Sequence, residues 1–302
     1  MKRKTFIRQM AIAGAMLSVP NELLALGHFE KITILHTNDT HSRIDPFPMD
    51  GGKWQGLGGF AARAAMIQQI RKQEKHVLLL DSGDILQGTP YFNFFGGEPE
   101  FKGMTAMGYD AVTLGNHDFD AGISGLKKLL PLAGFDILTA NYDFSDTELT
   151  KEFKPYRVIR KGNINVGIFG LGVELNGLVP SALFGNTRYL DPVSKATETA
   201  RHLKHEENCH LVICLSHLGY SYTNGRVSDI TLAKQTECID IILGGHTHTL
   251  LEDPVIVSNK KSEPVVIHQS GWGGTHLGRI DVFLNAKKEG KRIFSKPQKL
   301  VN

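Results

Sequence analysis

Nine short apolar runs, separated by helical or polar segments, constrain the fold of this 302-residue chain more than any other feature. They are rich in Ile, Val and Leu, and most are apolar at consecutive positions. Strands of this kind are buried on both faces, as in a mainly parallel sheet covered by helices. The runs span residues 32–35, 77–80, 111–114, 137–140, 166–170, 211–215, 239–243, 265–268 and 277–283.

Helix-like segments lie between several of these runs. Residues 59–75, 122–132 and 192–208 carry apolar side chains at helical spacing, and Asp191 followed by Pro192 is typical of a helix start. Alternating strands and helices predict an α/β fold, with one domain over residues 28–285. Two segments are expected to be loops, and the Pro- and Gly-rich residues 45–59 are one of them. The other is residues 171–191.

The first 27 residues have the pattern of a signal peptide. Four basic side chains come before or at the start of the apolar run 10–17, which is too short to cross a bilayer. Residues 3–8 resemble a twin-arginine signal in which Lys4 replaces the second arginine. The alternative is a buried N-terminal helix. The signal peptide predicts export to the periplasm or the extracellular space, without a membrane span.

Charge and cysteine content exclude several classes of protein. Without residues 1–27, which carry a net charge of +3, the rest of the chain is neutral, so a nucleic-acid surface is not expected. The basic segment 286–302 is expected to be a solvated tail. Three cysteines without close spacing predict buried free thiols, although one disulfide stays open.

Five polar clusters follow five of the apolar runs, where the strands are expected to end. They are residues 37–41, 81–84, 115–118 with Asp120, 216–217 and 244–248. In open α/β sheets, ligands bind beyond the carboxyl ends of the strands. We therefore expect these distant clusters to converge on one site.

The first two clusters supply carboxylates and an imidazole. Asp39 and His41 are alternate residues of extended chain and can reach one ion together. Their side chains suit borderline metals such as zinc, manganese or iron. Gly83 permits a sharp turn between Asp81, which is expected to cap that turn, and Asp84, whose two oxygens can bridge two ions.

The remaining clusters supply an amide and four histidines. Asn116 offers a neutral carbonyl oxygen, while His117 and Asp120 share a face if a helix starts there. A carboxylate on one imidazole nitrogen would fix the tautomer of His117. His217, His246 and His248 complete the set. These side chains together are typical of a hydrolytic site with two metal ions.

In these motifs the chain resembles the calcineurin-like metallophosphoesterases, and specifically the catalytic, N-terminal domain of the 5′-nucleotidase and UDP-sugar hydrolase family. The resemblance rests on residues 35–41, 81–84, 114–120, 215–219 and 244–248, with 269–271 and 277–279 near the end of that domain. It runs from about residue 32 to 282 and implies a four-layer α/β sandwich, in which two packed sheets are flanked by helices.

The resemblance also implies roles for the residues. One divalent ion would be held by Asp39, His41, Asp84 and His248, and the other by Asp84, Asn116, His217 and His246. His117 and Asp120 would be the catalytic pair. The family varies at the position of His248 between His, Gln and Asn. The ligand types admit zinc, manganese, iron or cobalt.

The implied function is that of an exported hydrolase of nucleotide phosphate esters, 5′-nucleotidase-like and used in nucleotide catabolism. Cyclic-nucleotide phosphodiesterase, UDP-sugar diphosphatase and sulfo-ester hydrolase remain alternatives on the same scaffold. The base-binding C-terminal domain of the 5′-nucleotidases is not expected in this sequence. Two further alternatives are a catalytic subunit that needs a separate base-binding partner and a metal-binding partner without activity of its own.

Overall fold

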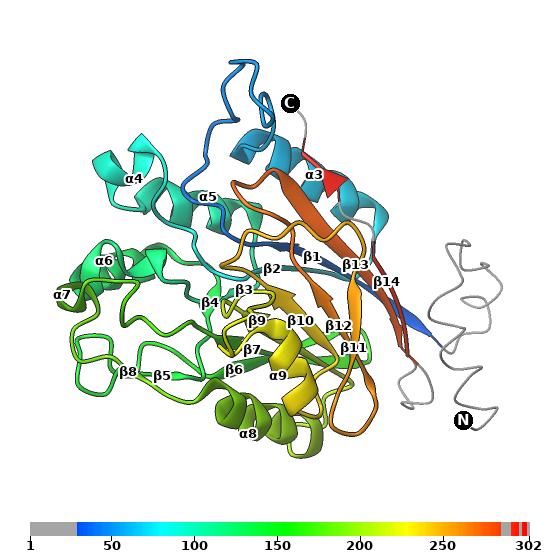
Figure 1. Ribbon diagram of the computed structural model, residues 1–302. Coiled ribbons are helices and arrows are strands. Elements are labelled where there is room, and N and C mark those ends of the chain that lie inside the picture. The colour runs from blue at the N-terminus through cyan, green and yellow to red at the C-terminus, as the bar shows by residue number, and fades with distance from the viewer. Residues whose placement is uncertain (1–28, 285–290, 296–297, 301–302) are drawn as a thin grey trace.

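The computed structural model describes residues 29–284, 291–295 and 298–300 (Figure 1). The predicted signal peptide lies outside these residues. Within them, every helix is too short or too polar to cross a membrane.

The first sheet contains the N-terminal strands and the end of the described chain. Its strand order is β14-β13-β1-β2-β3-β4, with β15 paired to β13. The strands are β1 (Glu30–Thr37), β2 (Val77–Asp81), β3 (Ala111–Val112), β4 (Asp136–Ile137), β13 (His276–Leu284), β14 (Lys291–Ser295) and β15 (Gln298–Lys299). Strands β1 to β4 are parallel, and β13 is antiparallel to β1.

The second sheet has the order β11-β12-β10-β9-β7-β6. Its strands are β6 (Tyr156–Lys161), β7 (Ile164–Leu171), β9 (Leu211–Ser216), β10 (Ile241–Gly244), β11 (Val255–Ser258) and β12 (Pro264–His268). The four central strands are parallel, and the edge strands β6 and β11 are antiparallel. A small pair, β5 (Tyr142–Asp143) and β8 (Arg188–Tyr189), stands apart.

Helices cover the outer faces of both sheets (Figure 1). The α-helices are α3 (Phe60–Gln73), α4 (Pro90–Phe95), α5 (Glu98–Met107), α6 (Gly122–Leu129), α7 (Ser181–Phe184), α8 (Pro192–His205) and α9 (Asp229–Gln235). Two short 3-10 helices are η1 (His117–Phe119) and η2 (Leu130–Leu132).

Three apolar layers hold this arrangement together. Ile34 and Leu80 of the first sheet pack with Ile213 and Leu243 of the second, which forms the core between the sheets. The opposite face of the first sheet packs against α3, α5 and α6, and that of the second against α8 and α9. The predicted two-sheet α/β sandwich is confirmed, and alternate residues of each central strand serve different layers.

Most of the predicted elements are present. All nine apolar runs fall in or overlap observed strands, and Asp191 caps α8 by accepting a 2.8 Å hydrogen bond from the backbone N–H of Ser194. The expected loop 171–191 was only partly right, because it contains α7 and β8. The sheet also continues past the predicted domain end at residue 285, since β14 pairs with β13.

A pair of buried histidines links the two sheets. His36 Nε2 on β1 lies 2.8 Å from His268 Nδ1 on β12, and both side chains are fully buried. Burial lowers the pKa of His268 to about 4, and burial with the neighbouring His268 lowers the pKa of His36. The folded protein therefore keeps both rings neutral at pH 7.

We predict that this histidine pair lowers the free energy of unfolding at acidic pH. The unfolded pKa of His268 is near 6.5 and the folded value is lower, so unfolded chains bind more protons as the pH falls below 6.5. At pH 5 this costs roughly 2 kcal/mol of stability. Urea unfolding at pH 7.5 and pH 5 should show a smaller loss in His268→Gln than in the parent protein. An equal loss would contradict the assignment.

A second prediction concerns the core between the sheets. Ile213 is fully buried there, so Ile213→Ala should lower the free energy of unfolding by about 2–5 kcal/mol. Leu178, which is 42% exposed, provides the control, and Leu178→Ala should change it by less than about 0.5 kcal/mol. Urea titration in the presence of a chelator measures both. Similar effects of the two changes would contradict the packing described.

Candidate metal centre

The carboxyl ends of parallel strands in both sheets meet at one edge, where two groups of metal-ligand side chains lie side by side. Asp39, His41 and His248 form the first group, and Asp84, His217 and His246 form the second. In each group the potential ligand atoms lie within 4.8 Å of one another.

Asp84 belongs to the second group but also faces the first. Its Oδ2 is 3.1 Å from His217 Nε2 and 3.9 Å from His41 Nε2, so it faces one histidine of each group. His217 Nε2 is also 3.9 Å from Asp39 Oδ1. This placement suits a carboxylate that contacts two ions at once. Asp81 caps the turn before it by accepting a 2.8 Å hydrogen bond from the N–H of Gly83.

Asn116 belongs to the same edge, through its neighbour Gly115. A Cβ on Gly115 would lie 2.2 Å from Asp84 Oδ1 and 2.7 Å from His217 Cε1, so only glycine allows this approach. The Oδ1 of Asn116 is buried and has no hydrogen-bond partner among the described residues. A buried amide oxygen without a partner is a position that a cation would satisfy.

Backbone carbonyls orient two of the histidines. His217 Nδ1 lies 2.6 Å from the carbonyl oxygen of Ser82, and His41 Nδ1 lies 3.2 Å from that of Gln87. A carbonyl only accepts, so each Nδ1 carries a proton and donates it. This leaves Nε2 of each ring directed at the site, as in metal-binding histidines.

The charges at this edge also fit divalent cations. Burial lowers the pKa of His217, but the carboxylates of Asp84 and Asp39 raise it to about 10, so a positive charge is favoured at this position. Burial and His217 lower the pKa of His246 to about 4, which keeps its lone pair free. His41 Nε2 and His248 Nε2 face each other at 3.0 Å. A cation in the place of a proton would satisfy all these groups.

The backbone is unusual at the same residues. Five of the predicted ligands have positive φ angles: Asp39 (49°), His41 (48°), Asp84 (56°), His246 (72°) and His248 (54°). Residues with side chains rarely adopt this left-handed conformation, which costs on the order of 1–3 kcal/mol each. Such strain gathers at functional sites because the surrounding structure enforces a particular side-chain direction.

The predicted catalytic pair, His117 and Asp120, is partly exposed. His117 Nδ1 is 2.8 Å from Asp120 Oδ2, and the backbone N–H of His117 donates to Asp84 Oδ1 at 2.8 Å. The 3-10 helix η1 brings the pair together, as the spacing predicted. Burial lowers the pKa of His117, but Asp84 and Asp120 raise it more. The imidazole is 37% exposed, so its other nitrogen can meet a substrate.

Two residues support the site without having been assigned a role from the sequence. The buried carboxylate of Asp118 accepts hydrogen bonds from the N–H groups of Asp84, Ile85 and Gly115 at 2.8–3.0 Å. Asn38 accepts from the N–H of Ser270 at 2.8 Å. Asp118 and Asn38 both lie inside the polar clusters, and their position there was the only indication of a role that the sequence gave.

Comparisons with known proteins agree with this geometry. Residues 32–250 match the calcineurin-like phosphoesterase family. The chain is 34% identical over 286 residues to a snake venom 5′-nucleotidase of Crotalus adamanteus, covering 87% of this chain and 47% of the relative. A 5′-nucleotidase precursor from Thermus thermophilus superposes with a TM-score of 0.82 at 31% identity, covering 90% of this chain and 55% of the other.

The structure of a Haemophilus influenzae NAD nucleotidase superposes with a TM-score of 0.80 at 30% identity, covering 91% of this chain and 51% of the other. This chain thus spans about half the length of these relatives. The family match includes all the clusters described above, and the chain belongs to the calcineurin-like phosphoesterase family.

Proposed function

We propose that the protein is a hydrolase of nucleotide phosphate esters that uses two divalent metal ions, in the manner of the 5′-nucleotidases. The observation that carries the proposal is the pair of ligand groups that meet at Asp84, with His117 and Asp120 beside them. Family membership supports the use of divalent metals.

In this proposal, the first ion is held by Asp39, His41, His248 and Asp84, and the second by Asp84, Asn116, His217 and His246. When bound, two divalent ions polarise a phosphoryl group and activate water for attack on phosphorus. The donors are carboxylates, imidazoles and an amide, which suit zinc, manganese, iron or cobalt.

The chain itself supplies the proton chemistry. Asp120 holds Nδ1 of His117, so Nε2 of the ring is the atom that meets the substrate. A protonated His117 stabilises the charge that develops on the phosphoryl oxygens and donates a proton to the leaving oxygen. The raised pKa of His117 favours the protonated ring.

The substrate class rests on the relatives. Two of them bear the name 5′-nucleotidase and one the name NAD nucleotidase, which supports a nucleotide substrate here. A separate protein that binds the base is also part of the proposal. Release of phosphate from AMP, UDP-glucose and a 2′,3′-cyclic nucleotide, assayed side by side, tests the class. No turnover of any of them by protein with bound metal would refute the proposal.

Export is the last part of the proposal. It is supported by the basic start and the short apolar run within residues 1–27. Expression of the full chain, followed by separation of periplasm, medium and cytoplasm, tests it. A full-length, uncleaved protein found only in the cytoplasm would argue against export.

We predict that His117→Ala separates catalysis from metal binding. The ring is proposed to contact the substrate and not an ion, so metal content should stay unchanged. Loss of a positioned proton donor should lower kcat by roughly 10²–10⁴-fold. Metal analysis and steady-state kinetics on AMP measure both effects. His205→Ala, on the surface of α8, is the matched control and should keep full activity.

Asp84→Asn should instead remove metal. The change deletes the negative charge that faces His41 and His217, so both ions lose a ligand charge at once. We expect less than one ion per chain after dialysis, against two in the parent protein, and loss of activity. The exposed Asp146 gives the control Asp146→Asn, which should keep both ions. Two retained ions in Asp84→Asn would contradict the shared ligand.

A further inference from the structure

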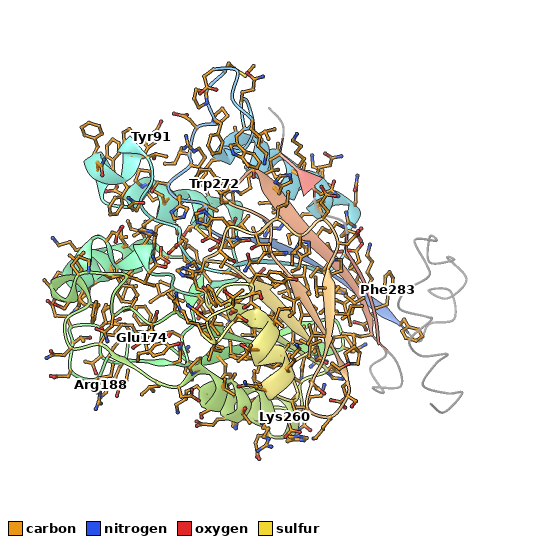
Figure 2. All side chains as sticks on the ribbon, in the orientation of Figure 1. Tyr91, Glu174, Arg188, Lys260, Trp272 and Phe283 are labelled. Carbon is orange, nitrogen blue, oxygen red and sulfur yellow. The ribbon has the colours of Figure 1, made fainter. Side chains whose placement is uncertain are left out.

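The indole of Trp272 lies flat against the imidazole of His248. The two ring centroids are 5.5 Å apart and the ring planes differ by 5°. We propose that Trp272 is a positioning residue that holds His248 in place for the ion of the first group. This inference rests on the proposed function, since it needs a metal ion beside His248. In the view of Figure 2, Trp272 lies between α4 and the strands of the first sheet.

His248 needs such support more than the histidines that carbonyls anchor. Its side chain is 40% exposed, whereas that of His217 is fully buried. His217 and His41 each donate Nδ1–H to a backbone carbonyl. Among the residues that the structure describes, no hydrogen bond to His248 Nδ1 is present. The flat contact with Trp272 therefore takes the place of the missing hydrogen bond in fixing the ring.

The loop that carries Trp272 is tied directly to the first ligand group. The backbone N–H of Gly273 donates to the carbonyl of Asp39 at 2.7 Å, and Asn38 Nδ2 donates to the carbonyl of Gly271 at 2.7 Å. Both glycines have positive φ angles, 80° and 60°, which let the loop turn sharply on either side of the tryptophan. Trp272 is thus fixed relative to Asp39 as well as to His248.

A second aromatic ring supports the indole. Phe47 meets Trp272 edge to face, with centroids 5.4 Å apart, and Arg43 lies over the ring of Phe47 at 4.0 Å. A Cβ on Gly273 would lie 2.8 Å from the ring of Phe47, so glycine is needed for this packing. A continuous row of contacts therefore runs from Arg43 through Phe47 and Trp272 to His248, the proposed ligand.

Because Trp272 contacts His248, we expect it to affect the metal affinity of the first ligand group only. The partners that orient a ligand typically contribute roughly 10–100-fold in metal affinity. Removing the indole frees an exposed imidazole, and the affinity of the first group falls. The second group contains His217, which is buried and separately anchored, so its affinity stays the same.

The chain contains two tryptophans, Trp54 and Trp272, which makes the contact measurable. Trp54→Phe leaves Trp272 as the only indole, and Trp272→Phe leaves Trp54. Bound Co²⁺ is paramagnetic and quenches an indole close to it. We expect Co²⁺ to quench the emission of Trp54→Phe in step with occupancy of the first site, and Zn²⁺ not to do so. In Trp272→Phe, the remaining emission from Trp54 should change little.

Calorimetric titration with Co²⁺ tests the positioning role. We expect the parent protein to bind two ions, and Trp272→Ala to lose roughly 10–100-fold in affinity at one site while the other is unchanged. Trp272→Phe keeps a ring against His248 and should recover most of that loss. Trp54→Ala is the matched control and should bind as the parent does.

The outcomes separate the inference from the proposed function. Failure of the parent protein to bind any divalent ion would refute both. Two bound ions in the parent protein with unaltered affinities in Trp272→Ala, or with no quenching in Trp54→Phe, would overturn the role of Trp272 alone. Equal weakening of both sites in Trp272→Ala would also overturn it, because a general loss of structure has that effect.

Discussion

Two buried carboxylates at the edge between the sheets impose the main constraint on this molecule. Asp39 is fully buried and Asp84 is 2% exposed, and a buried negative charge is costly unless positive charge lies beside it. Burial favours the neutral imidazoles of His41 and His246, and neutral imidazoles suit a metal cation better than an ion pair. Two divalent ions would bring four positive charges to two carboxylates. An excess of positive charge over these two carboxylates would favour an anionic substrate such as a phosphate ester.

Hydrogen bonds join the two sheets close to these buried carboxylates. Ser82 Oγ donates to the carbonyl of Leu243 across the gap at 2.8 Å, and its own carbonyl accepts from His217 Nδ1 at 2.6 Å. Asp118 binds the N–H groups of two neighbouring loops. Relative movement of the sheets at this edge would therefore displace ligands of both groups. The rigid core between the sheets serves the site by keeping their carboxyl ends in register.

The sequence predicted the layers and the convergence at strand ends because both follow from local patterns. Short runs of consecutive apolar residues mark strands that are buried on two faces, and Gly-Asn-His or Gly-Gly-His after such a run marks the end of a strand. Edge strand β6 was missed, since the exposed Arg157 and Arg160 interrupt its apolar pattern. Helix α9 was missed too, although Ser228 and Thr231 form a capping box. Trp272 gave no signal, because its partner His248 is near it only in space.

The order of the ligands along the chain has a consequence for how the protein is made. Asp39 and His246 are joined by hydrogen bonds although 207 residues separate them. At a synthesis rate of 5–20 residues per second, the first ligand leaves the ribosome about 10–40 s before the last. During that interval the early strands carry an acidic edge with no partner, and a cation captured there would meet an incomplete coordination sphere. The proposed centre would be complete only when the loop of Trp272 has emerged, so metal insertion would be a late event in the biogenesis of this protein.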